Sequence, residues 1–394
     1  MRNRNVYGLI SLLFIVFALT SIGTEIITPL WPIYIRSLGA SMVQIGFIFS
    51  ISSALSALLQ IPSGWLSDRY GRKWLNITGI LLGVLPPLLY IMAKDWTQLI
   101  PGVLLAGFSM GLYSPVRWSL VADLTTIEAR AKTYSWMIIA ATLGSVIGPI
   151  LGGVIADIYG LKTPFLLYFL LMVLSLPPAL LLKGETVTPS KGGSTTSMKT
   201  TEDSFLFSIL LFACIDALQG VSTGIITPLT PIFLVNAFSV DLGYVGFILA
   251  ISLGLATVIV QIPGGWLAGK LNRKSLLTAT FIFSAPFYAF FALSRNILEA
   301  FISLFLANAI ISISWPGWMG LLMEITPSKK RGLVNGVIAT SWWTGYMSGN
   351  ALSGLLWMMG VTIPYYTAAL FVLISVLPTF FLSDRRQRAS YSRE

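Results

Sequence analysis

The chain has 394 residues, of which 55% are apolar and only 10% are charged. A soluble domain carries roughly 25% charged residues, so the composition excludes a soluble globular protein and indicates a polytopic membrane protein. The net charge of +10 does not point to nucleic acid, because the Lys and Arg residues fall in short gaps between apolar runs. One Cys and no His argue against a disulfide framework and a metal centre, and no cofactor is expected.

Twelve apolar runs follow one another along the chain, each near the roughly 20 residues that a membrane-spanning helix requires. They predict helices over residues 7–35, 42–65, 75–93, 98–121, 134–157, 163–182, 205–236, 243–267, 275–294, 298–323, 332–358 and 362–382. The first run is too long for a signal-peptide core, so it is expected to be retained. The expected fold class is an all-α membrane protein with twelve transmembrane helices.

Lys and Arg are distributed unequally between the two sides of the predicted membrane. With the N-terminus inside, 20 of the 25 cationic residues fall in inner loops and tails, and Arg117 falls inside a helix. Positive residues accumulate on the cytoplasmic side of membrane proteins. Both termini are therefore expected in the cytoplasm, and the protein is expected in the cell membrane.

One long polar gap, residues 183–204, is rich in Gly, Ser, Thr and Lys. Such a composition predicts a flexible linker. It would join an N-terminal six-helix bundle, residues 1–182, to a C-terminal one, residues 205–394, which ends in a short basic cytoplasmic tail.

The two predicted bundles carry the same sequence features in the same order. Residues 60–73 and 261–274 are identical at eight of fourteen positions, and residues 24–34 match 223–233. Pro115 aligns with Pro316, and all offsets lie between 199 and 201. Six helices separate the copies, so both halves have the same orientation. Parallel repeats with a substrate site between them are typical of transporters.

The segment Gly64-x-Leu66-x-Asp68-Arg69-x-Gly71-Arg72-Lys73 lies between the second and third predicted helices. It resembles the signature loop of the major facilitator superfamily, and the resemblance extends to the helix count and the two-halves layout of the whole chain. The resemblance implies a cytoplasmic latch between the halves, made of Gly64, Asp68, Arg69, Gly71, Arg72, Asp123 and Arg130. Asp68 would be the latch anion. The alternative is a set of solvated loop charges.

The second copy of this loop has Gly269 where the first has Asp68, so any latch on that side is expected to be weaker. Asp157 and Glu324 lie at predicted helix ends, where we expect ordinary boundary charges.

A second motif, residues 144–153, resembles the glycine-proline motif of the drug:proton antiporter branch of this superfamily. Its marker residues are Gly144, Gly148, Pro149, Gly152 and Gly153. Glycines four residues apart form a groove for a partner helix, and Pro149 would bend the helix. The resemblance implies an exporter, and the alternative is generic packing by small residues. The second copy keeps the glycines but has Asn350 in place of Pro149.

The predicted helix 98–121 departs from the antiporter pattern. Where such antiporters have an Arg and a Gln, this chain has Val103 and Ala106. Proton coupling is then absent or located elsewhere. Arg117 is a possible substitute cation, although its side chain could instead extend to the inner membrane surface.

Two carboxylates lie within the predicted spans, Glu25 toward the outside and Asp216 in the inner half. Charges at such depth are costly and point to function, and the resemblance implies that both helices line a central cavity. With Arg117 they form the candidate proton or substrate site. Alternatively, Glu25 is solvated at the outer mouth and paired with Arg36.

Aromatic residues such as Trp315, Trp318 and Trp342 could belong to the interfacial belts or line an apolar pocket. The expected function is secondary active transport, by a monomer, that exports hydrophobic or amphipathic small molecules in exchange for protons. A sugar or metabolite transporter, possibly uncoupled, and a lipid flippase are the alternatives. An enzyme is disfavoured because the sequence has no nucleotide-binding loop.

Overall fold

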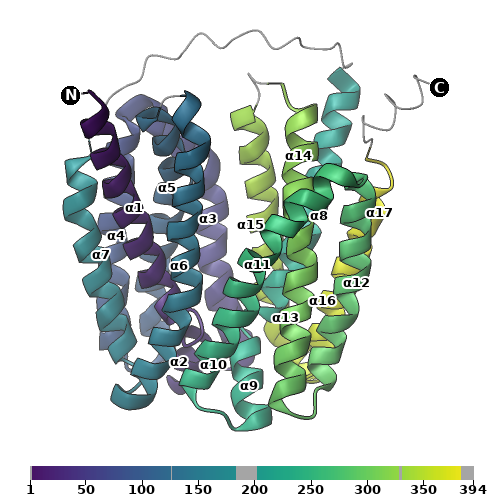
Figure 1. Ribbon diagram of the computed structural model, residues 1–394. Coiled ribbons are helices and arrows are strands. Elements are labelled where there is room, and N and C mark those ends of the chain that lie inside the picture. The colour runs from purple at the N-terminus through teal and green to yellow at the C-terminus, as the bar shows by residue number, and fades with distance from the viewer. Residues whose placement is uncertain (1, 126, 183–201, 328–330, 383–394) are drawn as a thin grey trace. The chain divides into compact units, whose positions relative to one another are not determined.

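All regular structure in the described residues is helical (Figure 1). The computed structural model describes residues 2–125, 127–182, 202–327 and 331–382. Within these ranges it describes only the backbone of residues 2–7, 68, 122–124, 127–132, 202–204 and 331–332. The predicted linker lies outside the described residues over 183–201, as does the predicted basic tail over 383–394.

The first half of the chain forms seven α-helices and one short 3-10 helix. They are α1 (Arg2–Ile27), α2 (Trp31–Ser37), α3 (Met42–Tyr70), α4 (Arg72–Met92), η1 (Trp96–Leu99), α5 (Ile100–Leu124), α6 (Ile127–Tyr159) and α7 (Thr163–Leu181).

The second half repeats this order with more interruptions. Its elements are α8 (Glu202–Ile226), α9 (Thr230–Phe238), α10 (Leu242–Leu249), the π-helix η2 (Ala250–Leu255), α11 (Ala256–Lys270), α12 (Arg273–Leu293), α13 (Ile297–Ile313), α14 (Trp315–Ile325), α15 (Arg331–Met359), α16 (Ile363–Ile374) and α17 (Val376–Thr379).

Ten spans in the described chain are long and apolar enough to cross a membrane, judged by length and composition. They correspond to the first ten predicted runs. The run predicted over 332–358 is α15, which is 29 residues long but is not among the ten. The last predicted run is the shorter apolar stretch Ile363–Thr379. All twelve predicted runs are therefore helical.

Proline positions explain why the first predicted run contains two helices. The residue before a proline is disfavoured in the α conformation, and α1 ends at Ile27, two residues before Pro29. The second half behaves in the same way, since α8 ends at Ile226 and Pro228 follows.

By their internal contacts, the residues form two compact units. Unit 1 comprises residues 1–192 and 231–250, and unit 2 comprises residues 193–230 and 251–394. This grouping differs from the division at the linker because α10 packs on α6 and so counts with unit 1. The division at residues 183–204 follows the sequence repeat, and it stays a prediction.

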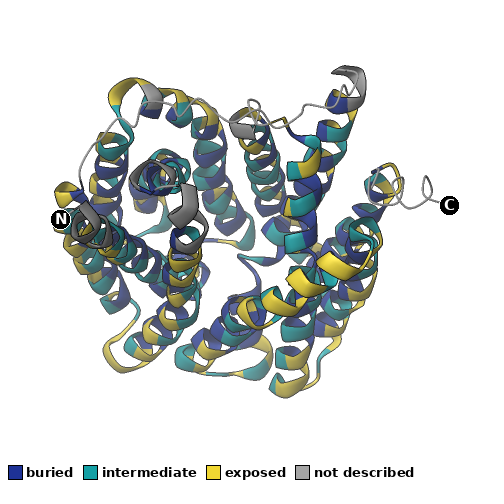
Figure 2. Cartoon of the chain, turned by 45° about the horizontal axis from the view of Figure 1, so that its top comes forward, coloured by how far each residue is buried: buried dark blue, intermediate teal, exposed yellow. Residues whose placement is uncertain are grey.

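Many large apolar side chains point away from the protein. Ile262 is 84% exposed, and Leu58, Leu210 and Phe381 are also exposed. Single helices carry buried and exposed residues side by side (Figure 2). In water such a surface would be costly, whereas lipid solvates it, as expected for a membrane protein.

The groove predicted from the glycine spacing of the second motif is filled by α1. A Cβ on Gly144 would lie 2.5 Å from the Cβ of Ser21, and one on Gly148 would lie 2.6 Å from the Cβ of Glu25. A Cβ on Gly152 would collide with the carbonyl of Ile26. Only glycine lets these two backbones approach so closely.

The other face of the same motif contacts α10. A Cβ on Gly153 would collide with the carbonyl of Leu242, and one on Gly246 would collide with the carbonyl of Pro149. The motif therefore packs α6 against two helices at once.

Candidate functional site

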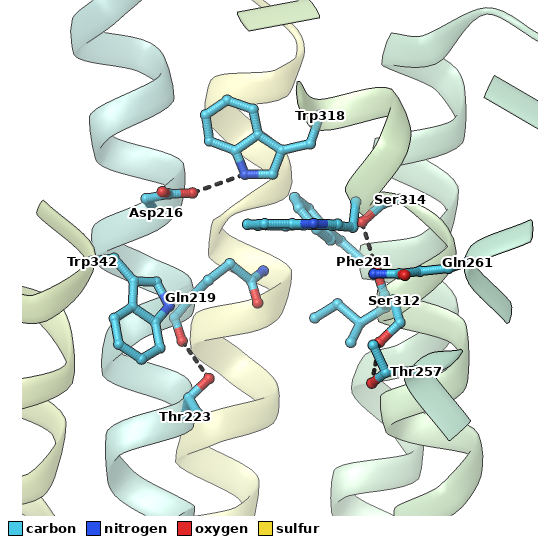
Figure 3. A pocket seen from close by; sticks show the side chains of 12 residues that line it. Asp216, Gln219, Thr223, Thr257, Gln261, Phe281, Ser312, Ser314, Trp318 and Trp342 are labelled. Atoms are coloured by element: carbon cyan, nitrogen blue, oxygen red, sulfur yellow. Dashed lines mark hydrogen bonds between the residues drawn. The ribbon is translucent and has the colours of Figure 1, made fainter. Parts of the chain in front are cut away.

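Unit 2 contains a cavity of about 320 Å³ among six helices, α8 and α11 to α15, and the residue that joins α13 to α14. Its lining combines aromatic rings, hydroxyls, amides and one carboxylate (Figure 3). The lining residues are Asp216, Gln219, Thr223, Thr257, Gln261, Phe281, Ile311, Ser312, Ser314, Trp315, Trp318 and Trp342.

Asp216, on α8, is the one charged residue among the described residues that line this cavity. It is 9% exposed, and its Oδ1 accepts a 2.9 Å hydrogen bond from the indole Nε1 of Trp318 (Figure 3). The Trp318 ring stacks in turn on Phe212, with centroids 4.4 Å apart. Packing on one side and a hydrogen bond on the other therefore hold the indole in place.

An interruption between α13 and α14 brings the tryptophans to the cavity. The helix is broken at Ser314, and Pro316 follows within the first turn of α14. Proline lacks the backbone N–H that would continue the series of hydrogen bonds along the helix. At the break, both the hydroxyl and the backbone N–H of Ser314 donate to the carbonyl of Ile311, at 2.6 and 3.2 Å. In spans with broken helices, the irregular backbone is tolerated where it lines a cavity.

The polar wall of the cavity offers hydrogen-bonding groups without charge. The hydroxyls of Thr257 and Ser312 lie 3.2 Å apart, and the Thr223 hydroxyl donates to the carbonyl of Gln219 at 2.9 Å. The Gln219 side chain donates to the Ser375 hydroxyl at 2.7 Å. With its aromatic rings, such a cavity suits a molecule that is partly apolar and partly polar.

Arg117, on α5, lies in unit 1 among aromatic rings. Its guanidinium carbon is 4.9 Å from the ring centroid of Phe17, 5.4 Å from that of Tyr113 and 5.8 Å from that of Trp118. Its Nε is inaccessible and has no hydrogen-bond partner among the described atoms. Cation–π contacts contribute up to about 2 kcal/mol each when desolvated, so the rings offset part of the cost of holding this charge.

Glu25 lies on α1 beside Gly148, and its carboxylate lies near the side chain of Thr28. The alternative pairing with Arg36 is not found, since the described residues contain no ion pair between them. Tyr113 is close enough to interact electrostatically with both Glu25 and Arg117. The structure thus groups Glu25, Tyr113 and Arg117 in unit 1, whereas Asp216 belongs to unit 2.

The sequence repeat relates the surroundings of Arg117 in unit 1 to those of Asp216 in unit 2. At the offset of 201 that aligns Pro115 with Pro316, Arg117 corresponds to Trp318. At the offset of 199 that aligns the first helices of the halves, Phe17 corresponds to Asp216. The contact between Arg117 and Phe17 is therefore the counterpart of the hydrogen bond between Trp318 and Asp216. Sequence comparison alone could have aligned the positions but not shown that they touch.

The latch residues are only partly visible. The side chains of Asp68, Asp123 and Arg130 lie outside the described residues. Arg69 lies over the Trp65 ring at 5.4 Å, and Arg72 donates from Nη1 to the carbonyl of Ser119 at 3.1 Å.

The two latch glycines differ in their surroundings. Gly71 has a φ of 90° between α3 and α4, a conformation that favours glycine. Gly64 has no neighbour that a Cβ would meet, so no close approach depends on it in this structure.

Two carboxylates expected to be ordinary boundary charges have specific partners. Glu324 forms an ion pair with Arg273, so the second copy of the loop keeps a charge pair although Gly269 replaces the aspartate. Asp157, at the end of α6, accepts hydrogen bonds from the backbone N–H groups of Leu242 at 2.9 Å and Gly243 at 2.6 Å. It thereby caps the N-terminus of α10.

Val103 is 2% exposed within α5, so this position of the antiporter pattern is filled by a buried apolar residue.

The sequence profile of the Major Facilitator Superfamily matches residues 13–223 and 211–394. The chain belongs to this superfamily, which consists of membrane transport proteins rather than enzymes. The predicted fold class and the resemblance to the superfamily are therefore confirmed. Members of the superfamily bind small-molecule substrates.

Two relatives cover nearly the whole chain. An uncharacterized MFS-type transporter of Methanocaldococcus jannaschii is 26% identical over 378 residues, 93% of this chain and 96% of that protein. Multidrug resistance protein 2 of Bacillus subtilis is 23% identical over 400 residues, 97% of this chain and 96% of that protein.

A solved structure supports the fold independently. A bacterial homolog of the human lysosomal transporter Spinster has a TM-score of 0.79 at 15% identity, over 97% of this chain and 96% of that one.

Proposed function

We propose that this transporter exports hydrophobic or amphipathic small molecules in exchange for protons, by alternating access. The observation that carries the proposal is the unit 2 cavity, where the Asp216 carboxylate lies among Trp315, Trp318 and Trp342. Aromatic faces bind flat apolar groups and cations, and a carboxyl group at this depth can take up a proton or face a cation. Distant relatives named for multidrug resistance support the export direction.

In this proposal, Asp216 and Glu25 are the carboxyl groups that exchange protons. No His is available for that role, and carboxylates are the remaining groups that can titrate at this depth. Arg117 supplies a fixed positive charge within reach of Tyr113 and, through it, Glu25. The latch loops and both termini lie on the cytoplasmic side of the cell membrane, as the distribution of Lys and Arg favours.

A neutral polar solute such as a sugar is a second candidate substrate. Gln219, Gln261, Thr257 and Ser312 give the cavity amides and hydroxyls beside its tryptophans. Sugar hydroxyls pair with such groups, and sugar rings stack on indoles. The two candidates differ in whether Asp216 contacts the substrate directly.

Flux into proteoliposomes with and without a pH gradient tests the proposal. The probes are ethidium as an amphipathic cation, Nile red as a neutral apolar dye and xylose as a sugar. We expect gradient-driven movement of the dyes but not of xylose, with Asp216→Asn and Glu25→Gln abolishing the gradient dependence. Asp241→Asn is the matched control, because the exposed Asp241 makes no side-chain cap hydrogen bond.

Two results would reject the proposal. Xylose flux alone would replace it with the sugar transporter. Dye flux that stays gradient-dependent in both carboxyl variants would remove these residues from proton coupling.

A further inference from the structure

Among the described residues, Arg117 combines a buried, unpaired Nε with a side chain that is partly exposed. The rings of Phe17, Tyr113 and Trp118 surround it at 4.9 to 5.8 Å. Arginine donates hydrogen bonds in its plane, through a fork of N–H groups. The Nε donor has no partner among the described atoms, and no described side chain forms a salt bridge with Arg117. The Nε itself is inaccessible, but the residue as a whole is partly exposed, so a ligand could reach the terminal N–H groups of the guanidinium.

Comparison with the second copy of the repeat shows that Arg117 lacks a hydrogen-bond acceptor among the described residues. In unit 2 the counterpart donor, Trp318, is paired with the carboxylate of Asp216 at 2.9 Å. In unit 1 the donor is a full cation, and Phe17 occupies the place of the carboxylate. A buried cation without an acceptor is costly. Unit 1 therefore has the stronger donor of the two and no acceptor at the equivalent position.

We propose that Arg117 is the binding site for an anionic oxygen group, such as a carboxylate, carried by an amphipathic molecule. A carboxylate accepts two parallel hydrogen bonds from a guanidinium, which fixes its orientation. Phe14, Trp118 and Tyr134 are only partly buried against the apolar cluster that contains Phe17, so the rest of the ligand would meet apolar surface. A transported solute and an anionic lipid headgroup share this chemistry. The proposal concerns binding alone and does not depend on proton-coupled export.

Paired probes test the charge requirement. The full-length protein in phosphatidylcholine nanodiscs is titrated with 1-pyrenebutyrate and with the neutral 1-pyrenebutanol, and energy transfer from tryptophan to pyrene reports binding. We expect the carboxylate to bind about tenfold more tightly or better, as a charged hydrogen bond implies. Arg117→Gln should bring the ratio of the two dissociation constants to about one, and Arg117→Lys should leave an intermediate ratio because lysine lacks the fork.

A substitution that keeps Arg117 supplies a second test. Phe17→Asp places a carboxylate where unit 2 has Asp216, and the internal partner should remove the preference for pyrenebutyrate. Gly8→Asp is the matched control, since it adds the same charge to α1 at a residue with no neighbour within 4 Å of a Cβ. The control should keep the wild-type ratio.

Two outcomes overturn the proposal: equal affinity of the wild-type protein for both probes, or a preference that survives Arg117→Gln and Phe17→Asp. Nanodiscs that also contain phosphatidylglycerol distinguish the source of the anion. Weaker pyrenebutyrate binding there identifies the lipid headgroup as an occupant of the site, and unchanged binding assigns the site to a solute. Both results support an anion site at Arg117.

Discussion

The indole N–H of Trp318 donates a 2.9 Å hydrogen bond to the carboxylate of Asp216, and the two residues lie 102 positions apart in the chain. Both residues line the unit 2 cavity (Figure 3). Its counterpart in unit 1 is Arg117 over Phe17. At the same helix contact, one half therefore has a carboxylate, Asp216, and the other half has a guanidinium, Arg117.

Replacing Trp318 by Phe should destabilise the protein by about 1.5–3 kcal/mol, because the ring can remain stacked on Phe212 while the carboxylate loses its donor. Chemical unfolding in detergent measures the change. In an Asp216→Asn background the same substitution should cost less, since the remaining acceptor is neutral. Trp315→Phe is the control within the cavity. An equal cost of Trp318→Phe in both backgrounds would show that the hydrogen bond contributes little.

Gly148→Ala should destabilise the contact between α1 and α6 by about 1–3 kcal/mol, as overpacking does in well-packed cores. The added methyl group would lie 2.6 Å from the Cβ of Glu25. Gly265→Ala should be neutral or stabilising by up to about 1 kcal/mol, because nothing lies near that position and alanine is the better helix former. Thermal unfolding of both variants measures the difference. Similar losses in the two proteins would count against the packing argument.

Asp157→Ala should loosen the start of α10, since it removes the acceptor of two backbone hydrogen bonds. Loss of an N-terminal cap costs about 1–2 kcal/mol. Hydrogen exchange of the Leu242 and Gly243 amides should become faster. Asp241→Ala should leave both amides unchanged, because Asp241 is the residue before α10 but makes no cap hydrogen bond. If Asp241→Ala has the larger effect, α10 is capped from within its own sequence.

Ser252→Ala should leave stability unchanged or raise it by up to about 1 kcal/mol. The Ser252 hydroxyl is fully buried in the π-helix and has no partner among the described atoms, and removing an unpaired polar group relieves its desolvation cost. The comparison is Ser284→Ala, which removes a 3.2 Å hydrogen bond to the carbonyl of Phe281 and should cost about 1 kcal/mol. A larger loss for Ser252→Ala would mean that the hydroxyl has a partner in the membrane-embedded protein.

The sequence predicted the helices well because lipid imposes a strong and local rule. Every backbone polar group must be satisfied within the membrane, so an apolar run of sufficient length becomes a helix. The interruptions at Pro29 and Pro228 could have been predicted from the missing proline N–H, whereas the π-helix at 250–255 has no comparable local signal.

The roles of individual charges were predicted less well. Asp157 and Glu324 lie near helix ends in the sequence, and nothing local distinguishes them from boundary charges. Their partners, Leu242 with Gly243 and Arg273, are 51 to 86 residues away. Such partners become visible only when the helices are packed.

By itself, the sequence determined the superfamily, the duplicated halves, the helical spans and the presence of Glu25, Arg117 and Asp216 within them. The tertiary structure decided which side chains meet these charges: Trp318 for Asp216, three aromatic rings for Arg117 and Thr28 for Glu25. The reason is physical. A helix in lipid is apolar on its outer and inner faces alike, so hydropathy does not fix its rotation about its own axis, and packing between helices does.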